Sequence, residues 1–317
     1  MAKQENYTFQ SADEQKTTIH AVKWLPESGE VKGVIQLVHG MIEYIERYSQ
    51  FAEYLTERGF VVMGHDHIGH GDSVSSPDDW GIMHAAHPDQ VMIEDMFTNY
   101  QIIKKQYPDV PYFILGHSMG SYMLREFLCE KADQFTGVNG AIIMGTGTVS
   151  PGTCNGGLFV LNLLKAFRGR DYKSASVANM MYDAPYKGYS LDGSDPENSW
   201  LSKNVESVKK YYTDPKDTFL FSVNGYYGMV TAVKYDGNVK NIRKMNHDIP
   251  ILFVSGADDP VGARSVGTQQ AYEKFKEAGI KDVTIKLFDG DRHEILQETD
   301  RLEVVFPYIY DWMSSKM

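Results

Sequence analysis

The chain carries several short, continuous apolar runs separated by segments of helical period. Such runs are typical of strands covered on both faces, whereas a half-exposed strand alternates apolar and polar residues. The runs lie at residues 34–38, 61–64, 112–115, 141–144 and 251–254. Residues 17–24 alternate instead, and this pattern predicts an antiparallel edge strand.

Segments with apolar residues every three or four positions lie between these runs and predict helices. They span residues 48–58, 88–106, 122–132 and 269–278. Because strands and helices alternate along the chain, we expect an α/β fold with a mostly parallel central sheet and helices on both faces.

The alternation breaks after Gly147. Residues 148–216 are rich in Gly, Ser, Asn, Asp and Tyr, and they hold one apolar stretch, residues 158–167, that predicts a short helix. We expect this segment to be an inserted cap domain over the carboxyl edge of the sheet. Residues 1–147 and 217–317 would then form the core. Ordinary surface decoration is the alternative for the insertion.

Composition and charge limit the possible functions. A formal net charge of −11 provides no basic surface for nucleic acid and disfavours an anionic membrane. Cys129 and Cys154 are too few for a disulfide framework, so we expect buried thiols in a reducing cytoplasm. The chain shows neither a signal peptide nor an apolar run of about 18 residues, and we expect no stable membrane insertion. The oligomeric state stays open.

The pentapeptide GHSMG at residues 116–120 directly follows the apolar run 112–115 and precedes a predicted helix. A G-x-S-x-G sequence between a strand and a helix is typical of a nucleophile elbow. The turn of such an elbow is so tight that only glycine fits two residues either side of the serine. Ser118 is therefore the candidate nucleophile.

A serine hydroxyl needs a histidine to accept its proton and an acid to orient that histidine. In a doubly wound hydrolase sheet both follow the serine in sequence, each just after a strand. Asp259 follows the run 251–254, and His293 follows the apolar segment 283–288. We expect Ser118, Asp259 and His293 to form a catalytic triad. Asp258 stays a second candidate for the acid, because spacing does not separate adjacent carboxylates in a turn.

The oxyanion that forms during acyl transfer is commonly bound by backbone N–H groups. Met119 directly follows the nucleophile, and Met41 lies in the turn after the run 34–38. We expect these two residues to supply the donors. Gly40 would let the backbone of that turn approach closely.

Residues 65–70, HDHIGH, come close to a metallohydrolase ligand pattern, H-x-H-x-D-H. Gly69 stands where that pattern needs aspartate, so we expect structural histidines and no metal. The chain has no G-x-x-x-x-G-K-[ST] loop, and residues 145–147 lack the third glycine of a dinucleotide loop. We therefore expect no cofactor.

Together these motifs resemble the monoacylglycerol lipase and bacterial lysophospholipase branch of the α/β-hydrolase fold. The resemblance rests on residues 39–48, 66–73, 116–120, 256–261 and 292–294, and it continues at 200–203 and 214–215. The family commonly has glycine and histidine where this chain has Ile42 and Tyr44. We therefore expect a bulkier loop beside the oxyanion hole, with a phenol that faces the leaving group.

The resemblance implies a serine hydrolase that cleaves carboxylic esters, above all those of monoacyl lipids. We expect Gly40, Ile42 and Tyr44 to contact the substrate, and Leu158 and Phe159 to line an acyl channel. Tight packing of the segment 158–167 between cap and core is the alternative to that channel. Other small or aromatic esters, amide hydrolysis, acyl transfer and non-catalytic ligand binding are alternative functions.

Overall fold

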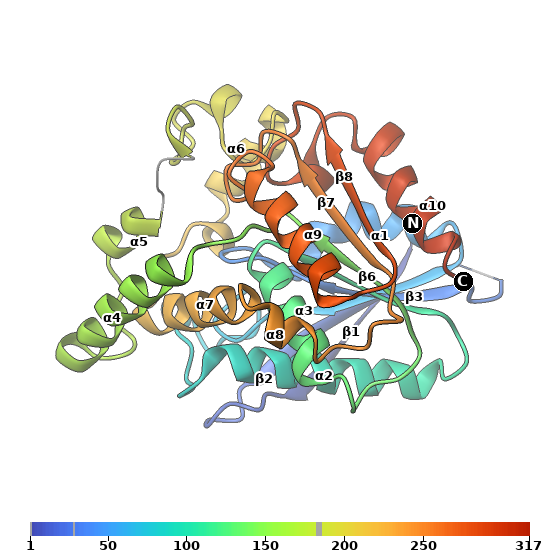
Figure 1. Cartoon of the computed structure of the whole chain (residues 1–317), viewed down its shortest axis with the longest axis horizontal. Coiled ribbons are helices and arrows are strands. Elements are labelled where there is room, and N and C mark those ends of the chain that lie inside the picture. The colour runs from blue at the N-terminus through green and yellow to red at the C-terminus, as the bar shows by residue number, and fades with distance from the viewer. Residues whose placement is uncertain (1, 28, 182–185) are drawn as a thin grey trace.

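The computed structural model describes residues 2–27, 29–181 and 186–317. Its centre is an eight-stranded sheet with the strand order β1-β2-β4-β3-β5-β6-β7-β8 (Figure 1). β1 and β2 pair antiparallel with each other, β2 pairs antiparallel with β4, and all later pairs are parallel. The predicted α/β fold with a mostly parallel sheet is confirmed.

The predicted apolar runs lie inside the parallel strands. The strands are β1 (Lys3–Gln10), β2 (Thr18–Leu25), β3 (Gly33–Val38), β4 (Phe60–His65), β5 (Tyr112–His117), β6 (Val138–Met144), β7 (Ile251–Gly256) and β8 (Val283–Phe288). Every residue of β3, β4, β5 and β7 is buried. β2 is antiparallel as predicted, but it is not an edge strand, because β1 pairs along its whole length. The mostly polar sequence of β1 gave no apolar signal.

Helices cover both faces of the sheet. The α-helices of the described residues are α1 (Ser49–Thr56), α2 (Pro88–Gln106), α3 (Met119–Glu130), α4 (Pro151–Arg168), α5 (Ala175–Met181), α6 (Val205–Thr213), α7 (Val223–Asp236), α8 (Val239–Ile242), α9 (Val266–Ala278) and α10 (Phe306–Ser314). One core lies between the sheet and α1 and α10, and the other between the sheet and α2, α3 and α9. Successive residues of β5 alternate between them, since Phe113 and Leu115 enter the first core and Ile114 the second.

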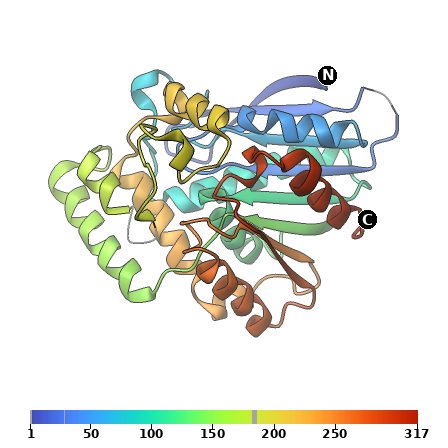
Figure 2. The same ribbon diagram turned by 90° about the horizontal axis from the view of Figure 1, so that it is seen from above.

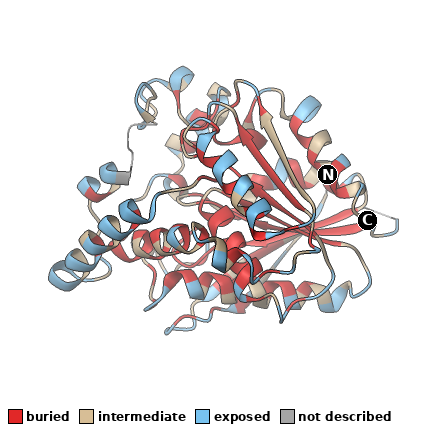
Figure 3. Cartoon of the chain, in the orientation of Figure 1, coloured by how far each residue is buried: buried red, intermediate tan, exposed pale blue. Residues whose placement is uncertain are grey.

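Helices α4 and α5 lie at one end of the molecule, away from the sheet (Figures 1 and 2). α4 packs along α7, and α7 packs against α2 and α3. The helix predicted at residues 158–167 is the second half of α4, which begins at Pro151 after Ser150 caps the backbone N–H of Thr153. Figure 3 shows the strands largely buried and α4 largely exposed.

Candidate active site

Ser118 forms the turn between β5 and α3. Its φ of 52° and ψ of −119° are strained for a residue with a side chain. The turn leaves no room beside it: a Cβ on Gly116 would lie 2.4 Å from the carbonyl oxygen of Gly120, and a Cβ on Gly120 would lie 2.2 Å from that of Val38. Both glycines are therefore needed for this backbone path.

His293 lies beside Asp259. Its Nδ1 is 3.1 Å from each carboxylate oxygen of Asp259. The buried carboxylate also accepts hydrogen bonds from the hydroxyl of Ser255 (3.0 Å) and the N–H of Val261 (2.8 Å). Burial raises the pKa of Asp259, but His293 and these hydrogen bonds outweigh burial and hold the pKa below its usual value. The carboxylate therefore stays charged beside the imidazole.

The adjacent Asp258 has different surroundings. It is exposed, its N–H donates to the carbonyl oxygen of Asp291 (2.9 Å), and its own carbonyl accepts from the hydroxyl of Tyr189 (3.0 Å). Of the two candidate acids, the structure therefore brings Asp259 to the histidine.

Ser118 and His293 face one cavity of about 490 Å³. Met41 and Met119, the two expected oxyanion donors, line the same cavity. Most of the remaining wall is apolar, and part of this apolar wall comes from α4, α5 and α7. These apolar residues are Cys154, Val160, Leu161, Val177, Met180, Met229, Val230 and Val233. The cavity is therefore polar beside Ser118 and His293 and largely apolar elsewhere.

The loop that follows β3 comes close to this serine. A Cβ on Gly40 would lie 3.0 Å from the Cβ of Ser118, so a larger residue would push the loop away. The N–H of Gly40 donates to Oε1 of Glu43 at 2.5 Å. Since Met41 is the next residue, the carboxylate of Glu43 helps to fix the backbone that bears this expected donor.

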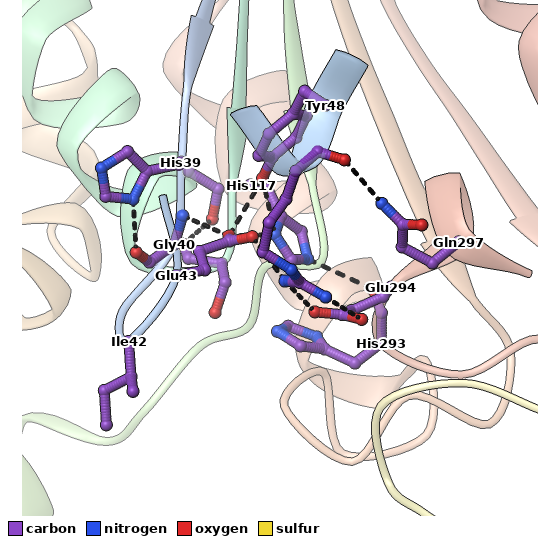
Figure 4. Close-up of polar contacts among 12 residues, drawn as sticks. His39, Gly40, Ile42, Glu43, Tyr48, His117, His293, Glu294 and Gln297 are labelled. Carbon is purple, nitrogen blue, oxygen red and sulfur yellow. Dashed lines mark hydrogen bonds and ion pairs between the residues drawn. The ribbon is translucent and has the colours of Figure 1, made fainter. Parts of the chain in front are cut away.

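Glu43 also belongs to a buried ionic network (Figure 4). Nδ1 of His117 lies 2.9 Å from Oε1 of Glu43, and Nε2 of His117 lies 3.3 Å from the carbonyl oxygen of His293. Both ring nitrogens of His117 therefore face acceptors, which favours the charged imidazolium. Burial lowers the pKa of His117, but the charge and hydrogen bond of Glu43 outweigh it and the net shift is upward.

Arg47 joins this network to the residue after His293. Its guanidinium lies 2.9 Å from Glu43, 2.6 Å from Glu294 and 3.4 Å from Asp217. Burial raises the pKa of Asp217 to about 8 although Arg47 opposes the shift. Sequence reasoning missed these contacts. The available signal was the spacing of Glu43 and Arg47, four residues apart in a motif at the sheet edge.

Comparison with known proteins adds the family. A family model described as "Serine aminopeptidase, S33" (Hydrolase_4) matches residues 29–300. The chain belongs to this family. The predicted resemblance to the monoacylglycerol lipase branch of α/β hydrolases is also confirmed.

Two relatives and one solved structure are similar to the chain over most of its length. The chain is 28% identical to "Monoglyceride lipase homolog" of Monkeypox virus, with 90% of this chain and 91% of the relative covered. It is 26% identical to "Monoglyceride lipase" of Rattus norvegicus, with 93% and 86% covered. A carboxyl esterase from Bacillus coagulans, solved in complex with glycerol, superposes with a TM-score of 0.88 at 28% identity and covers 98% of both chains.

Ile42 and Tyr44, which we expected to contact the substrate, form hydrogen bonds with other side chains. Ile42 adopts φ of 57°, and its carbonyl accepts from the hydroxyl of Tyr211 (3.1 Å). The hydroxyl of Tyr44 donates to Asp214 (2.9 Å). Neither residue is among the described residues that line the cavity.

The α4 residues also differ from the expectation. Leu158 packs against the core on the α2–α3 side, and Phe159 is 65% exposed. The cavity is lined instead by Thr153, Cys154, Gly157, Val160 and Leu161. These five positions recur at the spacing of one helical face. Because both faces of α4 carry apolar residues, the sequence pattern did not say which face turns inward.

The histidines of residues 65–70 are buried near His39. Burial lowers the pKa of His65 and His70 to about 3, so both are neutral at pH 7. His39 Nε2 accepts from the backbone N–H of His67 (2.9 Å), which ties β3 to the segment after β4. The cluster thus supports the loop that leads to Met41.

Within the described residues, one group of side chains has the spacing of a metal site: His20, Asp66 and Asp72. The ammonium of Lys216 lies 2.7 Å from Asp72 and already supplies a cation there. Asp66 accepts hydrogen bonds from the backbone N–H groups of Ile45 and Asp72, and it also faces His20, so its oxygens are occupied.

No helix in the described part of the chain is long and apolar enough to cross a membrane.

Proposed function

We propose that this chain is a serine hydrolase that cleaves carboxylic esters of monoacyl lipids through an acyl enzyme. The observation that carries the proposal is the common cavity of Ser118 and His293, with the buried Asp259 beside Nδ1 of the imidazole. A nucleophile on a strained turn, a base and an orienting acid are the three parts that this chemistry requires.

In the proposed mechanism the hydroxyl of Ser118 attacks the ester carbonyl while His293 accepts its proton. Asp259 holds the imidazole in one tautomer and stabilises the imidazolium that forms. The backbone N–H groups of Met41 and Met119 bind the oxyanion. His293 then protonates the leaving alcohol, and it activates the water that releases the acyl group. The scheme uses no metal and no cofactor.

The cavity supports a substrate with an apolar acyl chain. Its walls on α4, α5 and α7 are apolar, and they surround the space next to Ser118. We propose that residues 148–216 are a cap domain that shapes this space, together with Met229, Val230 and Val233 of α7.

Cys129 and Cys154 are buried and unpaired, in keeping with a cytoplasmic location.

The names of the relatives favour monoacylglycerol as the substrate class. The rat protein is named as a monoglyceride lipase, the viral protein as a monoglyceride lipase homolog, and the Bacillus coagulans protein as a carboxyl esterase. The description of the family model names an aminopeptidase, so an amide substrate is the competing assignment.

A rate profile over p-nitrophenyl esters of increasing chain length tests this proposal, followed by monoacylglycerol, lysophospholipid and a matched peptide amide. We expect kcat/KM to rise from acetate to medium chains, because each methylene buried in the chamber contributes about 0.8 kcal/mol. Monoacylglycerol should exceed lysophospholipid and the amide. Faster turnover of the amide, or a profile that falls with chain length, would reject the proposed substrate class.

A further inference from the structure

The indole of Trp200 lies against the imidazole of His293. The two ring centres are 5.2 Å apart and the planes are inclined by 26°, which is a stacked arrangement. Nε1 of Trp200 donates to the hydroxyl of Tyr212 (3.2 Å), and the ring of Tyr186 meets the indole edge-on at 5.5 Å. Trp200 is thus held from two sides while it contacts the histidine.

Backbone contacts fix the two segments relative to each other. The N–H of Glu294, directly after His293, donates to the carbonyl oxygen of Leu201 (2.7 Å). On the other side of the histidine, the guanidinium of Arg292 donates to the carbonyl oxygen of Ser199 (2.5 Å). The residues that flank Trp200 are therefore bonded to the residues that flank His293.

The buried carboxylate of Glu298 adds a second tie. One of its oxygens accepts from the N–H of Arg292 (2.8 Å), and the other accepts from the hydroxyl of Ser202 and the N–H of Lys203 (2.9 Å each). One side chain thus bonds the histidine loop and the chain just after Trp200. The stacked geometry is set by this framework and does not depend on the two rings alone.

A second ring lies close to the imidazole. His117 is centred 4.7 Å from His293, and its two nitrogens face acceptors, which favours its charged form next to the histidine. A charge that develops on His293 is therefore repelled by a charged His117, and the carboxylate of Glu43, 2.9 Å from His117, reduces this repulsion. The face of an indole is negative and attracts a cation, so Trp200 offsets this repulsion.

We propose that Trp200 is a positioning residue that holds the imidazole of His293 in its working orientation and stabilises its protonated form during catalysis. The inference rests on the proposed role of His293 as the base. Because the attraction of an indole is stronger for the imidazolium than for neutral imidazole, it lowers the energy of the transition state more than that of the bound substrate.

Kinetics of Trp200→Leu, Trp200→Phe and Trp80→Leu test this role on a p-nitrophenyl acetate substrate. Trp80 is the matched control, because it stacks on Phe219 and donates to the carbonyl of Gly71, neither of which lines the cavity. We expect Trp200→Leu to lower kcat about tenfold, as a desolvated cation–π contact predicts. Trp200→Phe should restore most of kcat, because it keeps an aromatic face. Trp80→Leu should change kcat less than twofold.

A role as a mere cavity wall would instead raise KM and leave kcat unchanged in Trp200→Leu. That result, or equal losses in the Leu and Phe variants, would overturn the proposal. Should Trp200→Leu fail to fold, Tyr212→Phe replaces it, because it removes the hydroxyl that holds Nε1 while keeping the ring. It should give a smaller fall in kcat, and an unchanged kcat would count against the proposal.

A fluorescence titration tests the contact without substrate. The emission of Trp200, taken as wild type minus Trp200→Phe, should fall in acid, because an imidazolium quenches an indole that it touches. The titratable and charged groups around His293 are Asp259, His117, Glu43 and Glu294, so His293→Asn serves as the reference. Acid quenching that persists in His293→Asn would reject the contact. If the wild type cleaves no ester while quenching follows His293, the proposed function fails and the contact stands.

Discussion

Two regions of the molecule are built in different ways. One is the carboxyl edge of the sheet, which carries Ser118, Asp259 and His293, and the other is the overlying segment, residues 148–216. At the edge, polar groups are buried and each is held by several partners: Asp259 is fully buried and has three, and Arg47 has three carboxyl groups within 3.4 Å. In the overlying segment, apolar side chains reach the surface, with Phe159 65% and Phe167 82% exposed. The edge thus has one geometry set by paired charges, whereas the segment presents apolar surface on two sides.

This difference separates two tasks. Buried charges that lose a partner are costly, by about 3–5 kcal/mol, so the edge does not rearrange easily and can hold reacting groups in place. Apolar surfaces are not directional, so a helix such as α4 can vary in sequence and still form a wall. We therefore propose that the chemistry belongs to the edge and the selectivity for the acyl chain to the segment.

The largest effect is expected at the edge, from Ser118→Ala. Loss of the nucleophile of a triad can lower kcat by about a millionfold. The control is Ser121→Ala, which removes a hydroxyl that only bonds the carbonyl of Ser118 (2.6 Å). Initial rates with p-nitrophenyl butyrate provide the measurement. If Ser118→Ala keeps a tenth of the wild-type rate, the edge does not carry the chemistry.

Asp259→Asn should follow, with a fall in kcat of roughly ten-thousandfold, because an amide stabilises the wrong tautomer of His293. Asp258→Asn is the matched control one residue away, and we expect it to change kcat less than threefold. Steady-state kinetics of both variants decide between them. The opposite ranking would show that the exposed carboxylate is the acid.

The next effect separates the two faces of α4. Val160→Ser should raise KM for long-chain esters about fivefold and spare acetate, because the lost apolar contact with the acyl chain corresponds to about 1 kcal/mol. Phe159→Ser is its outward-facing control and should leave both KM values unchanged. A long-chain defect that appears in Phe159→Ser alone would place the acyl chain on the outer face.

The smallest effect concerns stability in the core beneath the edge. Burial, aided by Asp236 and Asp89, raises the pKa of Glu126 from 4.5 to about 9. The unfolded chain loses this proton first, so this carboxyl makes the fold less stable as pH rises from about 4.5 to about 9. Glu126→Gln should therefore raise Tm by about 2 °C or more near pH 8, and by less near pH 5. A thermal melt that shows a larger gain near pH 5 would contradict the shift.

The sequence predicted the edge better than the segment above it, for physical reasons. The backbone around Ser118 requires Gly116 and Gly120, so the G-x-S-x-G motif by itself predicts the geometry of the turn. Asp258 and Asp259 are adjacent and chemically alike, and only folding buries one of them. Their spacing therefore did not separate them, and Asp258 stayed a second candidate beside the expected Asp259.

The remaining features depend on contacts between distant segments. No pattern around Trp200 indicates that it stacks on His293, because that contact depends on how two loops are bonded in the fold. The sequence also did not indicate which face of α4 turns toward the cavity. Its apolar residues surround the helix, so Leu158 and Phe159 were as plausible as Val160 and Leu161, which line the cavity.

The central claim, that the edge of the sheet holds a single activated serine, is tested most directly by mass spectrometry after labelling with a fluorophosphonate. The account predicts one adduct per chain, located on Ser118 in the peptide map, and no adduct in Ser118→Ala. Labelling of another residue, or equal labelling of the Ser118→Ala variant, would contradict it.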